Sequence, residues 1–148
     1  MASFTLTREI AAPTETVFEV LTDHRRYADM TGLRRSELER EGDPPPNGLG
    51  AVRRLVAVGP PLREEVIAYQ PPARFSYKLL SGLPVRDHVG TVELTPNGGG
   101  GTKMVYAVRS QPTVPVVGGV VIAVVKQAVK NLIGGIAKES ERRAGASG

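Results

Sequence analysis

The chain has 148 residues, 41% hydrophobic and 23% charged, which is typical of one globular domain. It contains no cysteine, which excludes disulfides, thiol nucleophiles and thiolate metal sites. The net charge is +4, but the basic residues are scattered pairs without an aromatic stacking platform, so nucleic-acid binding is not expected. No basic region followed by an apolar stretch begins the chain, so the cytoplasm is the expected location.

The first part of the chain predicts a strand followed by two short helices. Residues 4–10 alternate apolar and polar side chains, which is typical of a half-buried strand. Pro13 and Glu15 suit the first turn of a helix. A second short helix is expected over residues 24–30, ended by Gly32.

Six further strands are expected after these helices, separated by segments rich in glycine and proline. Their ranges are 33–41, 51–58, 62–69, 74–80, 85–94 and 102–109. The regular spacing of the turn signals predicts an antiparallel meander of hairpins.

The C-terminal segment from Val116 to about Arg143 predicts one long helix, apolar early and charged late. Its expected buried side carries Val121, Val125, Val129, Leu132, Ile133 and Ile136. The apolar run over 114–125 is shorter than the roughly 20 residues of a membrane span, so no transmembrane segment is expected. Because such a helix can cover one face of the sheet, residues 1–143 are expected to form a single α+β domain, followed by a disordered tail at 144–148.

Two glycine pairs interrupt this helix, Gly118-Gly119 and Gly134-Gly135. Each glycine costs about 1 kcal/mol against alanine in a helix interior. The pairs therefore indicate close packing, a bend, or a helix that begins nearer Val120.

Several short motifs follow one another along nearly the whole chain. They are Ile10-Ala11-Ala12-Pro13 with Val17-Phe18, Asp23 and Tyr27, then Gly50-Ala51-Val52-Arg53, then Glu64-Glu65-Val66 with Pro71-Pro72, Phe75 and Tyr77, then Gly90-Thr91-Val92-Glu93-Leu94 with the glycine turn and Thr102. In this order they resemble the SRPBCC (START-like, helix-grip) superfamily and, within it, the polyketide cyclase/dehydrase-like and lipid-transport-like group. The resemblance implies a curved seven-stranded antiparallel sheet wrapped around the long C-terminal helix, with a ligand cavity between them. It implies no particular reaction, because one fold hosts carriers, binders and enzymes.

The expected turns assign side chains to an inner face of the sheet. The expected pairs are Leu55–Glu65, Arg53–Ile67, Tyr69–Phe75, Glu65–Leu79, Tyr77–His88, Val92–Tyr106 and Leu94–Met104. With the helix, they give this expected ligand-binding set: Arg53, Leu55, Glu65, Ile67, Tyr69, Phe75, Tyr77, Leu79, His88, Val92, Met104, Tyr106, Val108, Val121, Val125 and Leu132. A slip of one residue would invert any of these strands.

The polar members of this face admit two interpretations. They either orient the polar head of an otherwise apolar ligand, or Arg53 and Glu65 form a structural pair while the tyrosine hydroxyls reach water. His88 is the best acid/base candidate, because an unperturbed histidine pKa of about 6.5 suits proton transfer near neutrality. Its neighbour Asp87 would point to the opposite face, so the two are not a catalytic pair. His24 is expected to be exposed and is given no role.

The function expected from these patterns is binding or carriage of a hydrophobic small molecule, such as a lipid, a fatty acyl chain or a polyketide-like aromatic. Its access route would lie near the short helices and the proline loop at 44–46. No cofactor is expected, and with two histidines and no cysteine neither is a zinc site. The protein is expected to be a monomer or a homodimer.

Three alternatives remain open. The first is a polyketide cyclase or dehydratase that polarises a carbonyl and moves a proton with His88, Tyr77, Glu65 and Arg53. The second is a protein-interaction module with a filled interior and an exposed apolar patch. The third is transient association with a membrane surface through the basic C-terminal helix.

Overall fold

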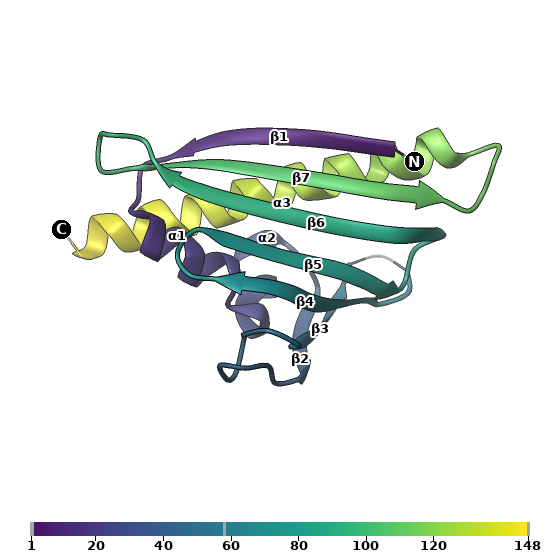
Figure 1. Ribbon diagram of the computed structural model, residues 1–148, viewed down its shortest axis with the longest axis horizontal. Coiled ribbons are helices and arrows are strands. Elements are labelled where there is room, and N and C mark those ends of the chain that lie inside the picture. The colour runs from purple at the N-terminus through teal and green to yellow at the C-terminus, as the bar shows by residue number, and fades with distance from the viewer. Residues whose placement is uncertain (1, 58, 148) are drawn as a thin grey trace.

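The computed structural model describes residues 2–57 and 59–147 (Figure 1). The strands are β1 (Ala2–Ile10), β2 (Arg35–Arg40), β3 (Val52–Val56), β4 (Leu62–Gln70), β5 (Arg74–Ser81), β6 (Val85–Pro96) and β7 (Thr102–Pro112). The helices are α1 (Thr14–Leu21), the 3-10 helix η1 (His24–Arg26), α2 (Tyr27–Thr31) and α3 (Gly118–Ser147). Three residues lie outside those described: Met1, Val58 and Gly148. The sequence predicted Met1 within the domain, Val58 in a strand and Gly148 in the tail.

The seven strands form one antiparallel sheet in the order β1-β7-β6-β5-β4-β3-β2. Helix α3 runs along one face of this sheet behind β1 and β7, and α1 and α2 lie beside it (Figure 1). The first two strands therefore occupy opposite edges, and the two short helices connect them. This architecture confirms the predicted α+β helix-grip fold.

The core lies between the sheet and the helices. The sheet contributes Val92, Leu94, Met104 and Tyr106 to this core. Helix α1 contributes Val17, Val20 and Leu21, and helix α3 contributes Val129, Ile133 and Ile136. Helix α2 ends at Gly32, whose φ of 76° is the left-handed conformation that favours glycine at a helix end.

Close packing of α3 against α2 explains the second glycine pair of α3. A Cβ added at Gly135 would collide with the backbone carbonyl of Met30 in α2, so the two helices approach each other directly through this glycine. Helix α3 also continues past Arg143, and Ala144 packs against the core. The domain boundary at 143 and the disordered tail at 144–148 stay predictions.

The strand registers agree with prediction at two turns. Val92 pairs with Tyr106 and Leu94 with Met104, as expected from the glycine turn. Tyr69 pairs with Phe75, as expected from the turn at Pro71-Pro72. Between β5 and β6 the prediction is wrong by two residues, because Tyr77 pairs with Gly90 and not with His88. A shift by two keeps every side chain on its predicted face.

The β3–β4 register corrects the prediction and changes the face. Leu55 pairs with Leu62 and Arg53 with Glu64, a shift of three residues from the expected pairing. The turn uses Gly59 at a φ of 92°, and the two prolines after it cannot donate ladder hydrogen bonds, so pairing resumes at Leu62.

An odd shift exchanges the two faces of a strand. Glu64 and Val66 are buried where Glu65 and Ile67 were expected, and Leu79 pairs with Glu64. An irregularity between Val66 and Ala68 then restores the predicted pairing of the next residues.

Candidate functional site

Most of the predicted ligand-binding residues are buried between the sheet and the helices. Arg53, Leu55, Phe75, Tyr77, His88, Val92, Met104, Tyr106, Val108 and Val125 are buried, and Tyr69, Leu79, Val121 and Leu132 are half-buried. Glu65 and Ile67 are wrongly placed in that set. Ile67 is 40% exposed, and the Glu65 carboxylate forms ion pairs with Arg40 and Lys78 instead.

A buried ion pair joins β3 to β4. The Arg53 side chain is 1% exposed. Its Nε donates to Glu64 Oε1 at 2.8 Å, and its Nη2 lies 2.7 Å from the same oxygen in the ion pair. Its Nη1 donates to Nδ1 of His24 at 3.3 Å. One of the two interpretations of the sequence paired Arg53 with Glu65. The true partner is its neighbour, because the strand is shifted by an odd number of residues.

Aromatic rings enclose the guanidinium of Arg53. Its Cζ lies 4.7 Å from the ring centroid of Tyr27, 4.9 Å from that of Tyr77 and 5.5 Å from that of Phe75. These distances are those of cation–π contacts. Burial acts to lower the pKa of Arg53, but the interactions with Tyr27, Glu64 and the other tyrosines raise it above its usual value. The core therefore holds a permanent positive charge.

His24 is fully buried, which corrects its expected exposure. Because arginine can only donate, His24 Nδ1 accepts from Arg53, so Nε2 carries the proton and donates to the carbonyl oxygen of Asn47 at 3.1 Å. Burial, together with the charge of Arg53, lowers the pKa of His24 to about 3. His24 is therefore neutral near pH 7 and connects the Asn47 loop to the buried arginine.

The sequence contains one signal that could have placed His24 in the core. A 3-10 helix has three residues per turn, so side chains three apart lie above one another. His24 precedes the buried Tyr27 by three residues, whereas Arg25 and Arg26 point elsewhere and are exposed.

Farther along the same face lie two more polar pairs. The hydroxyl oxygens of Tyr77 and Tyr106 are 2.6 Å apart, and His88 Nδ1 lies 2.9 Å from Ser110 Oγ. Burial raises the pKa of both tyrosines, with Glu64 adding to the effect on Tyr77. Burial lowers the pKa of His88. All three titratable side chains are therefore neutral near pH 7.

These groups form one connected set, which we call the inner polar row. It consists of His24, Arg53, Glu64, Tyr77, Tyr106, His88 and Ser110. The Tyr77 ring is the link between its parts, because its centroid lies 6.4 Å from the centroids of both Tyr106 and His88. The sequence pattern predicted Arg53, Tyr77, Tyr106 and His88 on this face but did not predict His24, Glu64 or Ser110 there.

A bulge in β6 positions His88. The pairing with β7 shifts between Arg86 and Val89, and Asp87 within this irregularity has a φ of 52°. Asp87 is exposed while His88 is buried. The two side chains therefore lie on opposite sides, as expected, and do not form a catalytic pair.

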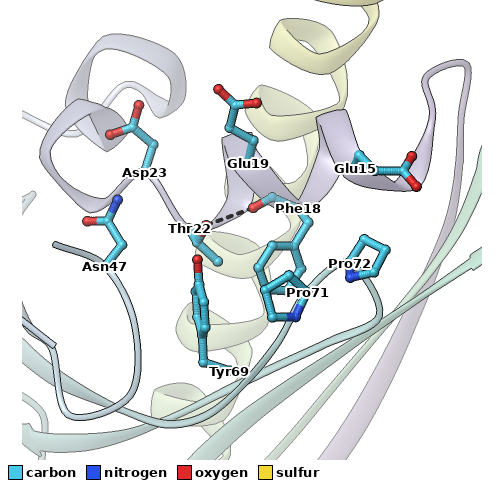
Figure 2. A pocket seen from close by; sticks show the side chains of 9 residues that line it. All are labelled: Glu15, Phe18, Glu19, Thr22, Asp23, Asn47, Tyr69, Pro71 and Pro72. Atoms are coloured by element: carbon cyan, nitrogen blue, oxygen red, sulfur yellow. Dashed lines mark hydrogen bonds between the residues drawn. The ribbon is translucent and has the colours of Figure 1, made fainter. Parts of the chain in front are cut away.

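A surface hollow of about 470 Å³ lies between α1, the Asn47 loop and the β4–β5 turn. Its lining residues are Glu15, Phe18, Glu19, Thr22, Asp23, Asn47, Tyr69, Pro71 and Pro72. Figure 2 shows the three carboxylates on one side and the rings of Phe18, Tyr69 and Pro71 on the other. Phe18 and Tyr69 pack edge to face with ring centroids 5.2 Å apart. The hollow lies in the region where the sequence analysis placed ligand access.

Two further observations bear on the class of site. Across residues 2–57 and 59–147, no group of three or more His, Asp and Glu side chains is placed to hold a metal ion. One helix, Gly118–Gly145 within α3, is long and apolar enough by composition to cross a membrane, and 28% of its most apolar 18-residue window is buried in the protein.

Comparison with known proteins gives a family match and several similar structures. A sequence model of the family described as "Polyketide cyclase / dehydrase and lipid transport" matches residues 1–141. No curated protein sequence matches the chain. These results confirm the resemblance found in the sequence.

Three similar solved structures illustrate the range of proteins with this fold. The Zhui aromatase/cyclase from Streptomyces sp. R1128 has a TM-score of 0.81 at 23% identity, covering 99% of this chain and 98% of that one. A START superfamily protein from Mycobacterium smegmatis has a TM-score of 0.80 at 15% identity, with 95% and 97% covered. A protein from Thermus thermophilus, TTHA0849, has a TM-score of 0.70 at 22% identity, with 99% of both chains covered. At these identities the likeness establishes the fold.

Proposed function

Because the chain belongs to the polyketide cyclase/dehydrase and lipid-transport family, we propose that it binds or carries a hydrophobic small molecule, held between the sheet and α3. The family and the fold support a role in hydrophobic ligand binding or a cyclase-like role in general. The chemical class, a lipid, fatty acyl chain or polyketide-like aromatic, and the contact with the inner polar row are our inference. A cytoplasmic location and a monomeric or homodimeric state stay predictions.

The observation that carries this proposal is the inner polar row itself. Burying a guanidinium and a carboxylate costs several kcal/mol, and replacing such a pair by apolar side chains is often neutral or stabilising. Stability alone therefore does not explain why Arg53 and Glu64 lie inside this core. A small number of polar groups on an apolar wall is the usual composition of a small-molecule site.

The tyrosine pair can offer a ligand one hydrogen-bond donor. When one phenol donates to the other, the accepting hydroxyl keeps its own proton, which is then free for a third group. Tyr77 and Tyr106 are 2.6 Å apart and are flanked by the apolar side chains of Val92, Met104 and Val108. A carbonyl or hydroxyl oxygen at the end of an apolar ligand would accept that proton.

A second candidate function is cyclase or dehydratase chemistry at the same groups. Arg53 holds its charge 4.9 Å from the Tyr77 ring, where it would favour a phenol that donates to a developing oxyanion. His88 is neutral near pH 7 because burial lowers its pKa, and a neutral imidazole can accept a proton. The two candidates thus share one site and differ in whether the bound molecule is transformed.

Native mass spectrometry of the protein purified from its own host, followed by organic extraction, tests the binding proposal. We expect a stoichiometric apolar ligand. Titration with a fluorescent fatty acid should show about tenfold weaker binding for Tyr106→Phe, the loss of roughly one hydrogen bond, while Ile67→Ala serves as an outer-face control and binds normally. A ligand-free mass with no probe uptake would contradict the proposal. Turnover of a polyketide-like substrate that falls in His88→Gln would favour the second candidate.

A further inference from the structure

Four valines at the start of α3 and in the loop before it lie in solvent. Val116 is 92% exposed, Val117 43%, Val120 63% and Val124 61%. We call this group the valine patch. A cluster of exposed large aliphatic side chains is unusual on a monomeric surface and indicates an interaction site. It lies at the end of the sheet away from α1, near the N-terminus of the chain (Figure 1).

The patch is one face of the helix and not a loosely packed core. Val120 and Val124 are four residues apart, so they lie above one another on the same side of α3. Val125 and Val129, which lie on a different side, are buried against the sheet. The helix therefore has its own core contact, and the valine patch faces outward.

The stretch of sequence that contains the valine patch carries charges of one sign. Between Glu93 and Glu139 the sequence contains no acidic residue. The same stretch carries Lys103, Arg109, Lys126, Lys130 and Lys138. Lys126 and Lys130 are exposed on α3 within two turns of Val124. The Lys126 ammonium lies 6.0 Å from the ring centroid of Phe4 in β1. Lys130 lies about 80° around the helix from Val120 and so flanks the valine patch. An apolar helix face with a lysine at its edge is the pattern of a segment that lies in the interface of an anionic bilayer.

We propose that the valine patch docks this protein on an anionic lipid bilayer, with the valines among the headgroups and Lys130 next to lipid phosphates. The helix lies on the bilayer and does not cross it, because its other side contributes Val129, Ile133 and Ile136 to the core. A symmetric dimer through the same patch is disfavoured, since an isologous contact would bring the cationic side chains of both copies to one interface. The docking surface is separate from the inner polar row and does not depend on which ligand the protein carries.

Vesicle flotation with the full-length protein tests the proposal. We expect binding to phosphatidylcholine vesicles that contain phosphatidylglycerol at about a three-to-one ratio, weak binding to pure phosphatidylcholine, and release at high salt. The double substitution Val120→Thr with Val124→Thr should lower the bilayer partition coefficient about tenfold. Lys130→Gln should lower it about fivefold.

Ile67→Thr is the matched control, because Ile67 is an exposed aliphatic residue on β4, outside the valine patch. It should leave the partition coefficient unchanged. Since the chain has no tryptophan, Val120→Trp introduces a single reporter, which brominated lipids should quench; Ile67→Trp should not be quenched. Circular dichroism and light scattering establish that each variant is folded and give its mass.

Equal binding of the wild type and the double valine variant would overturn the proposal. So would binding to neutral vesicles as strong as binding to anionic ones. A wild-type dimer that dissociates in the double valine variant, without vesicle binding, would assign the patch to a second copy of the chain instead.

Discussion

Helix α3 has two parts that are similarly apolar in sequence but lie in opposite environments. In its later part, Ile133 and Ile136 are buried and the helix packs against α1 and α2. At its beginning, Val120 and Val124 are mostly in solvent. An apolar helix face gains free energy when it is removed from water, but it can be buried only where another surface packs against it. The short helices α1 and α2 provide that surface for the later part of α3. We therefore assign an external surface, the lipid bilayer, to the beginning of the helix.

The largest expected difference between the two parts is in side-chain truncation. Ile136→Ala should lower the free energy of unfolding by about 2–5 kcal/mol, because it leaves a cavity in the core. Val124→Ala should change it by less than about 0.5 kcal/mol, since the side chain is already exposed. Urea unfolding measures both. Similar losses in the two variants would show that the start of α3 is packed in solution.

A smaller difference should separate the two neighbouring glycines of α3. Gly135→Ala forces a methyl group against the backbone of Met30 and should cost about 1–3 kcal/mol of unfolding free energy. At Gly134 an added Cβ meets no atom within 4 Å, so Gly134→Ala should stabilise by up to about 1 kcal/mol through helix propensity. Opposite shifts of the thermal midpoint are expected. Stabilisation by both substitutions would mean that α2 does not contact the helix there.

The smallest expected effect, over one pH unit, is the acid sensitivity that the buried His24 in η1 adds to the stability of the protein. The native pKa of His24 is about 3, below the unfolded value of about 6.5, so the unfolded state binds the proton more tightly. Stability should therefore fall as the pH drops below about 6.5, by about 1 kcal/mol over the first unit from this residue alone. Urea unfolding at a series of pH values measures the slope.

His24→Gln is the matched variant for this measurement, because an amide keeps a donor and an acceptor but does not titrate. Its pH slope should be shallower than that of the wild type. Burial also lowers the pKa of His88, so some acid sensitivity should remain. An identical slope in both proteins would show that His24 is not buried as neutral imidazole.

The fold could be predicted from the sequence because its turn and helix-end signals are strong. Seven alternating segments, a glycine at the end of α2 and one long amphipathic stretch give the order of the elements and the single sheet. The registers could be predicted where a turn has one clear centre, as at Asn97–Gly101. The register could not be predicted at Gly59-Pro60-Pro61, because the sequence allows the turn to centre either on Gly59 or on a proline.

The same ambiguity limited the site. Glu64 and Glu65 are adjacent acids, and only the register decides which one meets Arg53. His24 and Ser110 were missed for a different reason. The burial of His24 follows the three-residue period of a 3-10 turn, and that of Ser110 depends on its contact with a bulged strand; alternation at a period of two predicts neither. Tyr77, Tyr106 and Val92 were placed on their faces because their strands are regular there.

The position of β1 at the edge of the sheet has a consequence for how the protein is made. Ala2 pairs with Ser110 and Ile10 with Thr102, so β1, which is synthesised first of these seven strands, has its partner in β7, which is synthesised last of them. Until β7 has been synthesised, β1 is an unpaired edge with apolar side chains on one side. Pairing between such distant segments slows folding and exposes the chain to aggregation. The charged residues Arg8 and Glu9 near the end of β1 lie where they can protect the nascent strand from pairing with other chains.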